Sequence, residues 1–170
     1  VLTYTWEQLN LRKAFVRSVR PDTGRIRYIP SIDNQIKEDK KWEKLPNRRM
    51  MLNYQITARD NRAIQGGIGT NRIEIEVTNR AGPFEVKRPR RGTKAIVNQP
   101  LTVRWNPANT NKSPVNCEFV NIYLSTDLGK SFQLIQDFIK NKNGRAIITL
   151  PDIRSKQAIL KITCPNNIFF

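Results

Sequence analysis

Apolar and polar residues alternate along much of this chain, and helical spacing of apolar residues is scarce. The alternation is clearest in residues 2–6, 52–58, 73–77 and 101–105. A period of two predicts strands that bury one face. Shorter apolar segments between Pro, Gly and Asn residues predict further strands at 84–86, 119–125, 132–135, 146–150 and 158–163. Strands at this spacing predict an all-β fold of the β-sandwich type.

Residues 12–49 fit this pattern least, because they are basic and interrupted by Pro21, Pro30 and Pro46. They contain one possible short strand at 25–29 and a possible helical turn at 36–42. A loop of this length is uncommon in a compact domain unless it has a role or packing of its own. We therefore expect a long irregular insertion that lies across one sheet. Its expected anchors are Phe15, Tyr28, Ile29, Trp42 and Leu45.

The best domain boundary lies in the segment 79–83, which follows a clear strand and contains Gly82-Pro83. It divides the chain into two domains, residues 1–80 and 81–170. Each is small but contains large apolar side chains for a core. The expected core residues are Trp6, Trp42 and Tyr54 in the first domain, and Trp105, Phe119, Tyr123, Phe132, Phe138 and Ile148 in the second.

Charge adds a candidate binding surface. Thirty Lys and Arg residues against 14 Asp and Glu give a net charge of +16, which favours anionic partners. The one dense cluster consists of Lys87, Arg88, Arg90, Arg91 and Lys94. It is either an anion-binding patch or a solvated loop between strands. No aromatic residues interleave it, so a platform for stacking single-stranded bases is not expected and nucleic acid is an unlikely partner.

The sequence contains no histidine. This excludes Ser-His-Asp triads, Cys-His dyads and histidine zinc sites, each of which needs an imidazole. We expect no catalytic residues, no metal and no cofactor in this chain. No run of apolar residues approaches the roughly 18 to 20 that span a bilayer, so no membrane span is expected.

Cys117 and Cys164 are the two cysteines of the chain. An even count in a β-rich, export-like sequence permits a disulfide, which would stabilise the fold by restricting the unfolded chain. Two buried free thiols are an equal alternative from the sequence.

A compact turn motif follows the strand predicted at 119–125. Its residues are Ser125, Asp127, Gly129 and Phe132, in the pattern Ser-x-Asp-x-Gly-x-x-Phe. The carboxylate can accept backbone hydrogen bonds across a turn, and glycine permits a positive φ. The pattern resembles the Asp-box of sialidases, where it is a structural turn. A glycosidase ranks last among the functions considered, since the chain has one copy and no plausible pair of catalytic acids.

Combined motifs along nearly the whole chain resemble the region that follows the catalytic domain in secreted bacterial reprolysin-like zinc metalloproteases. In the first half the matching segments are 2–8, 42–46, 52–61 and 66–67. In the second half they are 81–86, 103–105, 114–117, 120–129 and 167–170.

This resemblance implies two tandem Ig-like or fibronectin-like β-sandwiches. The first, residues 1–80, would be PKD/cadherin-like and carry the insertion at about 12–49; the second, residues 81–170, would be Ig/fibronectin-like and carry the Asp-box-like turn. It also implies an extracellular location, secreted or at the cell surface, and further strand before Val1 and after Phe170. The zinc-binding His-Glu-x-x-His of the proteases has no counterpart in these residues.

Two functional hypotheses follow. The first is a non-catalytic accessory or docking region of such a protease, with the catalytic domain of the same chain and a protein or cell-surface ligand as partners. The alternative is an adhesion module that binds an acidic glycan or nucleic acid through the basic cluster. Salt-dependent retention on heparin separates the two, because contacts to phosphate or sulfate weaken steeply with salt.

Overall fold

The computed structural model describes residues 1–9, 16, 18–37 and 43–170, which form two compact units, Val1–Asn79 and Arg80–Phe170. Strands dominate both units, and within the residues described α1 (Ile32–Ile36) is the one α-helix. The predicted all-β class is confirmed at this level. No helix among these residues is long and apolar enough to cross a membrane.

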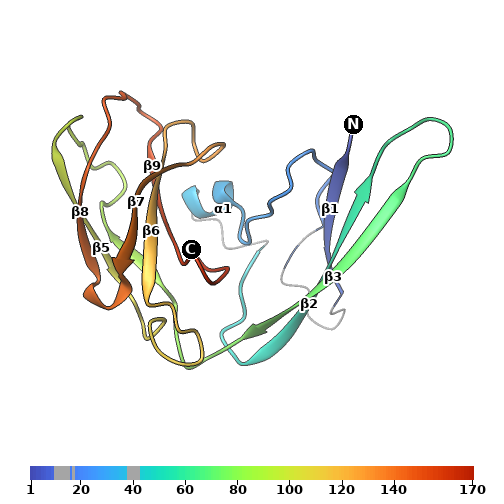
Figure 1. Cartoon of the computed structure of the whole chain (residues 1–170), viewed down its shortest axis with the longest axis horizontal. Helices are drawn as coiled ribbons and strands as arrows, with labels where there is room; N and C mark the ends of the chain where they lie inside the picture. Colours follow the sequence, from blue (N-terminus) through green and yellow to red (C-terminus); the bar gives the residue numbers. More distant parts are fainter. Residues whose placement is uncertain (10–15, 17, 38–42) are drawn as a thin grey trace. The chain divides into compact units, whose positions relative to one another are not determined.

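One antiparallel sheet with the order β1-β2-β3 forms the first unit (Figure 1). Its strands are β1 (Thr3–Gln8), β2 (Met50–Arg59) and β3 (Ile68–Val77). Trp6 pairs with Ile56, and Leu52 pairs with Ile75. The sequence predicts a sandwich here, whereas the described residues contain this single sheet. The described part of the segment that joins β1 to β2 forms no strand of a sheet, so it cannot pair into a second layer.

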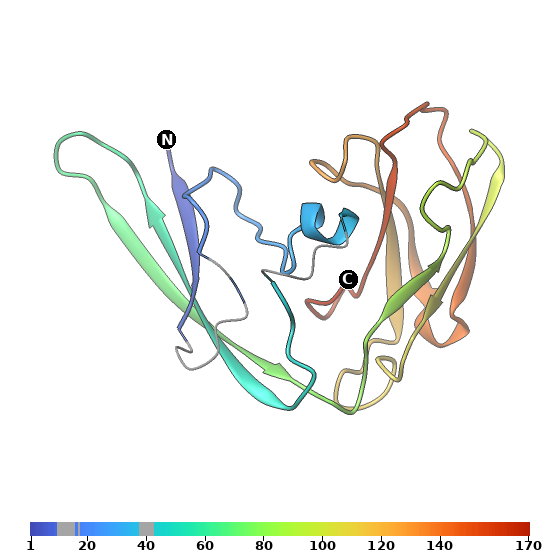
Figure 2. The same ribbon diagram turned by 180° about the vertical axis from the view of Figure 1, so that it is seen from behind.

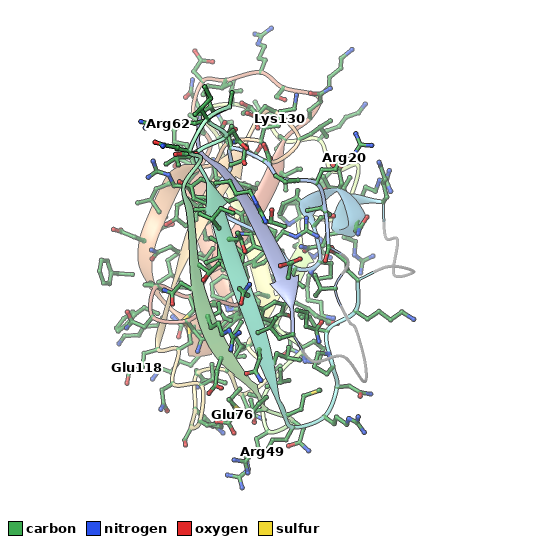
Figure 3. The ribbon with its side chains drawn as sticks, turned by 90° about the vertical axis from the view of Figure 1, so that its right-hand side faces the viewer. Arg20, Arg49, Arg62, Glu76, Glu118 and Lys130 are labelled. Carbon is green, nitrogen blue, oxygen red and sulfur yellow. A yellow bond between two sulfur atoms is a disulfide. The ribbon has the colours of Figure 1, made fainter. Side chains whose placement is uncertain are left out.

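The ends of this sheet carry charged side chains, as Figure 3 shows. Arg49 and Glu76 lie together at one end, where the Arg49 guanidinium is 2.9 Å from Glu76 Oε1. Arg62 lies at the other end, in the connection between β2 and β3.

The segment between β1 and β2 packs on one face of the sheet, as expected of the insertion. Val16 is buried against Leu52 and Tyr54, and Ile29 packs against the same cluster. Tyr28 is half-buried. Apolar side chains from the insertion therefore complete the small core of the first unit.

Other expectations for the insertion were wrong or lie outside the described residues. Leu45 is 56% exposed and anchors nothing. Residues 25–29 form no strand. Most of the segment 36–42, where a helical turn is expected, lies outside the described residues, and helix α1 covers Ile32–Ile36 before it. Phe15 and Trp42 lie outside the described residues.

A buried carboxylate, Glu43, ties the insertion together in place of these apolar anchors. It is 3% exposed, forms a salt bridge with Arg27, and accepts a hydrogen bond from the Ser31 N–H at 2.7 Å. Ser31 in turn caps α1 by accepting the Asn34 N–H. Burial, followed by the charge of Glu43, raises the pKa of Tyr54 above its ordinary value.

Two antiparallel three-stranded sheets form the second unit (Figures 1 and 2). The first has the order β4-β5-β8 and consists of β4 (Glu85–Arg88), β5 (Pro100–Asn106) and β8 (Arg145–Thr149). The second has the order β7-β6-β9 and consists of β7 (Gln133–Lys140), β6 (Phe119–Ser125) and β9 (Ile159–Thr163). The short 3₁₀ helix η1 (Asn141–Asn143) joins β7 to β8.

The two sheets share one core. Its buried members are Val103, Trp105, Cys117, Val120, Ile122, Ala146, Ile148, Ile162 and Cys164. Alternate residues of β5, β6 and β8 point inward, which is the pattern expected of two packed sheets. Trp105 and Ile148 are buried as predicted, but Phe138 is 70% exposed, so its assignment to the core was wrong. It lies in β7 at a positive φ of 48°, where the pairing with β6 shifts register.

A buried amide fixes the start of β8 beside β5. Asn141 is fully buried; its Oδ1 accepts the Trp105 indole N–H at 2.9 Å, and its Nδ2 donates to Thr110 and to the Cys117 carbonyl. Gly144 follows at a φ of 60°, and its carbonyl accepts the Trp105 N–H at 3.0 Å. We call Trp105, Asn141 and Gly144 the β5–β8 clamp.

Cys117 and Cys164 form a disulfide with their Cα atoms 6.0 Å apart. Of the two alternatives that the sequence leaves open, the structure contains the bridge. Both cysteines belong to the core of the second unit, and 47 positions separate them along the chain.

We expect the disulfide to stabilise the second unit by about 4 kcal/mol, as chain entropy gives for a loop of this length. The double variant Cys117→Ala, Cys164→Ala should lose that amount in urea unfolding of the full chain. Wild-type protein in reductant should behave like the variant. An unfolding midpoint that does not move with reductant would contradict the prediction.

The β5–β8 clamp predicts that Gly144→Ala destabilises the protein by about 1–3 kcal/mol, the cost of one strained backbone position. A Cβ at Gly144 would lie 2.9 Å from the Trp105 carbonyl oxygen, at a positive φ. Gly69→Ala is the matched control, because a Cβ there has nothing within 4 Å. Equal urea midpoints for the two variants would show that the clamp does not constrain the fold.

Candidate anion-binding site

The predicted basic cluster lies at one edge of the sheet β4-β5-β8. Lys87 and Arg88 end β4, and Arg90, Arg91 and Lys94 follow in the loop that leads to β5. All five side chains are exposed. Lys87 forms a salt bridge with Glu85, two residues earlier on β4, so part of its charge is balanced locally.

Strand pairing adds two arginines to the cluster that are distant in the sequence. Arg88 pairs with Arg104 of β5, and Arg104 pairs with Arg145 of β8. The three side chains thus lie side by side across the sheet, on its exposed face. We call Arg88, Arg104 and Arg145 the arginine row. Arg104 and Arg145 were not identified from the sequence as part of the cluster.

The hydrogen-bond pattern brings two members of the row especially close. The Trp105 N–H donates to the carbonyl of Gly144, the residue just before β8. The adjacent pair Arg104 and Arg145 is therefore a non-hydrogen-bonded pair of the antiparallel ladder. Such pairs have the shorter cross-strand separation, about 4.5 Å between Cα atoms. At β4, a register shift leaves two basic residues, Lys87 and Arg88, opposite Arg104.

Within the described part of the chain, no acid forms a salt bridge with the arginine row. Glu85, which lies opposite Asn106 on the same exposed face, pairs with Lys87. Like charges directly opposite one another across strands destabilise a sheet. The row therefore costs stability in the free protein, and a bound anion would relieve that cost.

A shallow depression of about 270 Å³ adjoins the row. Its lining residues are Arg88, Pro89, Arg90, Thr93, Leu101 and Thr102. Guanidinium groups bind sulfate, phosphate and carboxylate through paired hydrogen bonds, and the threonine hydroxyls can both donate and accept. No aromatic ring lines the depression.

The predicted turn after β6 forms a network of hydrogen bonds. The buried Ser125 hydroxyl donates to Asp127 Oδ1 at 2.7 Å and accepts the Gly129 N–H at 2.7 Å. Asp127 also accepts the N–H and the hydroxyl of Ser131, and Gly129 has a φ of 83°. Phe132 is half-buried under the Lys161 ammonium group, 3.8 Å from the ring centroid. These hydrogen bonds run from one turn residue to another, which is typical of a structural turn.

The hydrogen bonds of this turn stabilise the charged form of Asp127. The Ser131 hydroxyl contributes most, followed by the Ser131 N–H and the Ser125 hydroxyl, and together they hold the pKa of Asp127 well below its ordinary value.

Comparisons of the chain with known protein families, curated proteins and solved structures give no match. The resemblance to the metalloprotease region therefore stays a prediction from the sequence motifs.

The turn predicts a pH-dependent effect of Asp127→Ala. Because the pKa of Asp127 is lower in the folded than in the unfolded chain, its contribution is complete above the ordinary value of 3.8 and is lost as pH falls below it. The variant should be less stable than wild type at pH 7 in thermal melts, and the difference should shrink between pH 4 and pH 2. Asp152→Ala, which replaces an exposed aspartate, should leave the melting temperature unchanged at every pH. A constant difference at all pH values would contradict this.

Proposed function

We propose that the second unit is a non-catalytic module that binds acidic glycans through the arginine row and the basic loop beside it. The observation that carries the proposal is the direct opposition of Arg88, Arg104 and Arg145, none of which forms a salt bridge within the described residues. The repulsion between these arginines destabilises the free protein, and binding of an anion would remove that repulsion and so favour the complex.

Two features favour a glycan over nucleic acid. The exposed face of β5 and β8 carries Thr102, Arg104, Arg145, Ile147 and Thr149, with no ring on which a base could stack. Guanidinium groups and hydroxyls suit a chain that carries sulfates or carboxylates between sugar hydroxyls.

The wider context is also a proposal. We infer that the second unit is an Ig/fibronectin-like sandwich, on the basis of its two packed antiparallel sheets. We further propose, from the sequence motifs alone, that the chain serves as an accessory or docking region of a secreted or cell-surface bacterial zinc metalloprotease. Binding of an acidic glycan would suit that role, since it would hold the protease at a surface.

Arg104→Thr tests the proposal, because Arg104 is the middle of the row. We expect earlier elution of the full chain from heparin and a shallower dependence of affinity on salt, as one anion contact is lost. We also expect the free protein to gain about 0.2–1 kcal/mol of stability at low salt, because two like-charge pairs disappear.

Arg59→Thr is the control for this experiment. Arg59 is an exposed strand arginine whose paired neighbours, Thr3 and Ile68, are uncharged. Arg59→Thr therefore changes the net charge as Arg104→Thr does, but it removes no arginine–arginine pair. Equal losses of heparin affinity in both variants would refute a defined site and leave only the general charge of +16.

A further inference from the structure

We propose that the depression beside the arginine row is a subsite for one sulfated sugar unit, so that the module selects a sulfated glycan. This inference rests on the proposed function. It adds a second kind of contact to the charge of the row, namely hydrogen bonds from the backbone of β5.

The depression lies next to the point where the pairing between β4 and β5 ends. The pairing of the two strands ends at Arg88, opposite Arg104, and Pro89 comes next. Residues Pro100–Thr102 of β5 therefore pair with β8 on one side and have no strand on the other.

The direction of the Thr102 backbone follows from the clamp. Trp105 directs its N–H toward β8, where it meets the Gly144 carbonyl. Strand residues turn their backbone groups to alternate sides, so Thr102, three positions earlier, directs its N–H and C=O toward the side that β4 has left. Within the residues described, neither group has a hydrogen-bond partner.

The remaining lining completes a site for a single sugar. Arg88, Arg90, Thr93 and Thr102 are the polar residues of its mostly apolar lining, and a bound sugar would direct its anionic substituent toward the two arginines. Pro89 and Leu101 supply apolar surface for the carbon skeleton of a ring. The volume of about 270 Å³ lies just below the roughly 300–1,000 Å³ of pockets that hold drug-sized ligands, which suits one ring better than several.

A sulfate group fits this chemistry better than a lone carboxylate. It offers three oxygens in different directions, so it can face two guanidinium groups and still accept the Thr102 N–H. A carboxylate has two oxygens in one plane, so after one bidentate arginine its remaining acceptor sites all lie in that plane.

Thr102→Phe tests the subsite, because Thr102 is an exposed strand residue and phenylalanine suits a strand while filling the depression. We expect the full chain to lose about tenfold or more in affinity for a heparin tetrasaccharide, since charge-assisted hydrogen bonds are lost. Affinity for long heparin should fall less, because Arg104 and Arg145 still bind its other anionic groups. Thr149→Phe, on the same exposed face but outside the depression, should bind both probes like wild type.

Amide NMR of the wild-type chain gives a direct readout. Titration with the tetrasaccharide should shift the Thr102 and Thr93 amide resonances, whereas a tetrasaccharide stripped of sulfate should leave them in place. Shifts confined to Arg104 and Arg145 would overturn the subsite, as would equal effects of the sulfated and desulfated probes. Equal competition by a single-stranded oligonucleotide would overturn the choice of a glycan.

The outcomes separate this inference from the proposed function. If Arg104→Thr weakens heparin binding and Thr102→Phe does not, the row binds anions and the subsite is wrong. If Thr102→Phe weakens tetrasaccharide binding and Arg104→Thr changes nothing, the subsite stands and the proposed role of the row fails.

Discussion

The pairing of β5 with β8 depends on the β5–β8 clamp, and the candidate site depends on that pairing. The Asn141 side chain satisfies the indole N–H of Trp105 inside the core, while the Gly144 carbonyl accepts the Trp105 backbone N–H. A Cβ at Gly144 would lie 2.9 Å from the Trp105 carbonyl oxygen at a positive φ, so glycine is the residue that enters β8 here without strain. Since a slip of one residue moves every side chain of a strand to the other face, the same contacts that bury Trp105 also place Arg104 beside Arg145.

The proposed binding of anions would exchange some stability for affinity. The inner face of the sheet β4-β5-β8 buries apolar side chains such as Val103 and Trp105. On its outer face, Arg104 lies directly opposite Arg145. The disulfide between Cys117 and Cys164 lies in the same core and stabilises it by restricting the unfolded chain. A unit held in this way can tolerate several unfavourable tenths of a kcal/mol per pair on its surface.

Sequence patterns predicted strands well because alternation is a local property. Nine predicted strand segments overlap strands of the structure, since each was read from its own neighbouring residues, whereas the possible strand at 25–29 does not form. The single sheet of the first unit and the exposed Phe138 were missed, because each depends on contacts between distant segments. For the same reason the basic cluster could be located but the arginine row could not. The alternation in 101–105 indicated that Arg104 faces solvent, yet nothing local indicated that Arg145 lies beside it.

The end of β4 links the two parts of the candidate site physically. A register shift leaves two basic residues opposite Arg104, and β4 then ends at Arg88, which uncovers the backbone of β5 at Thr102. If β4 continued for another pair of residues, its backbone would occupy the Thr102 N–H and C=O and close the depression. If β4 ended earlier, Arg88 would lose its place in the row. High charge and unpaired backbone groups thus occur together because both arise where this one strand ends.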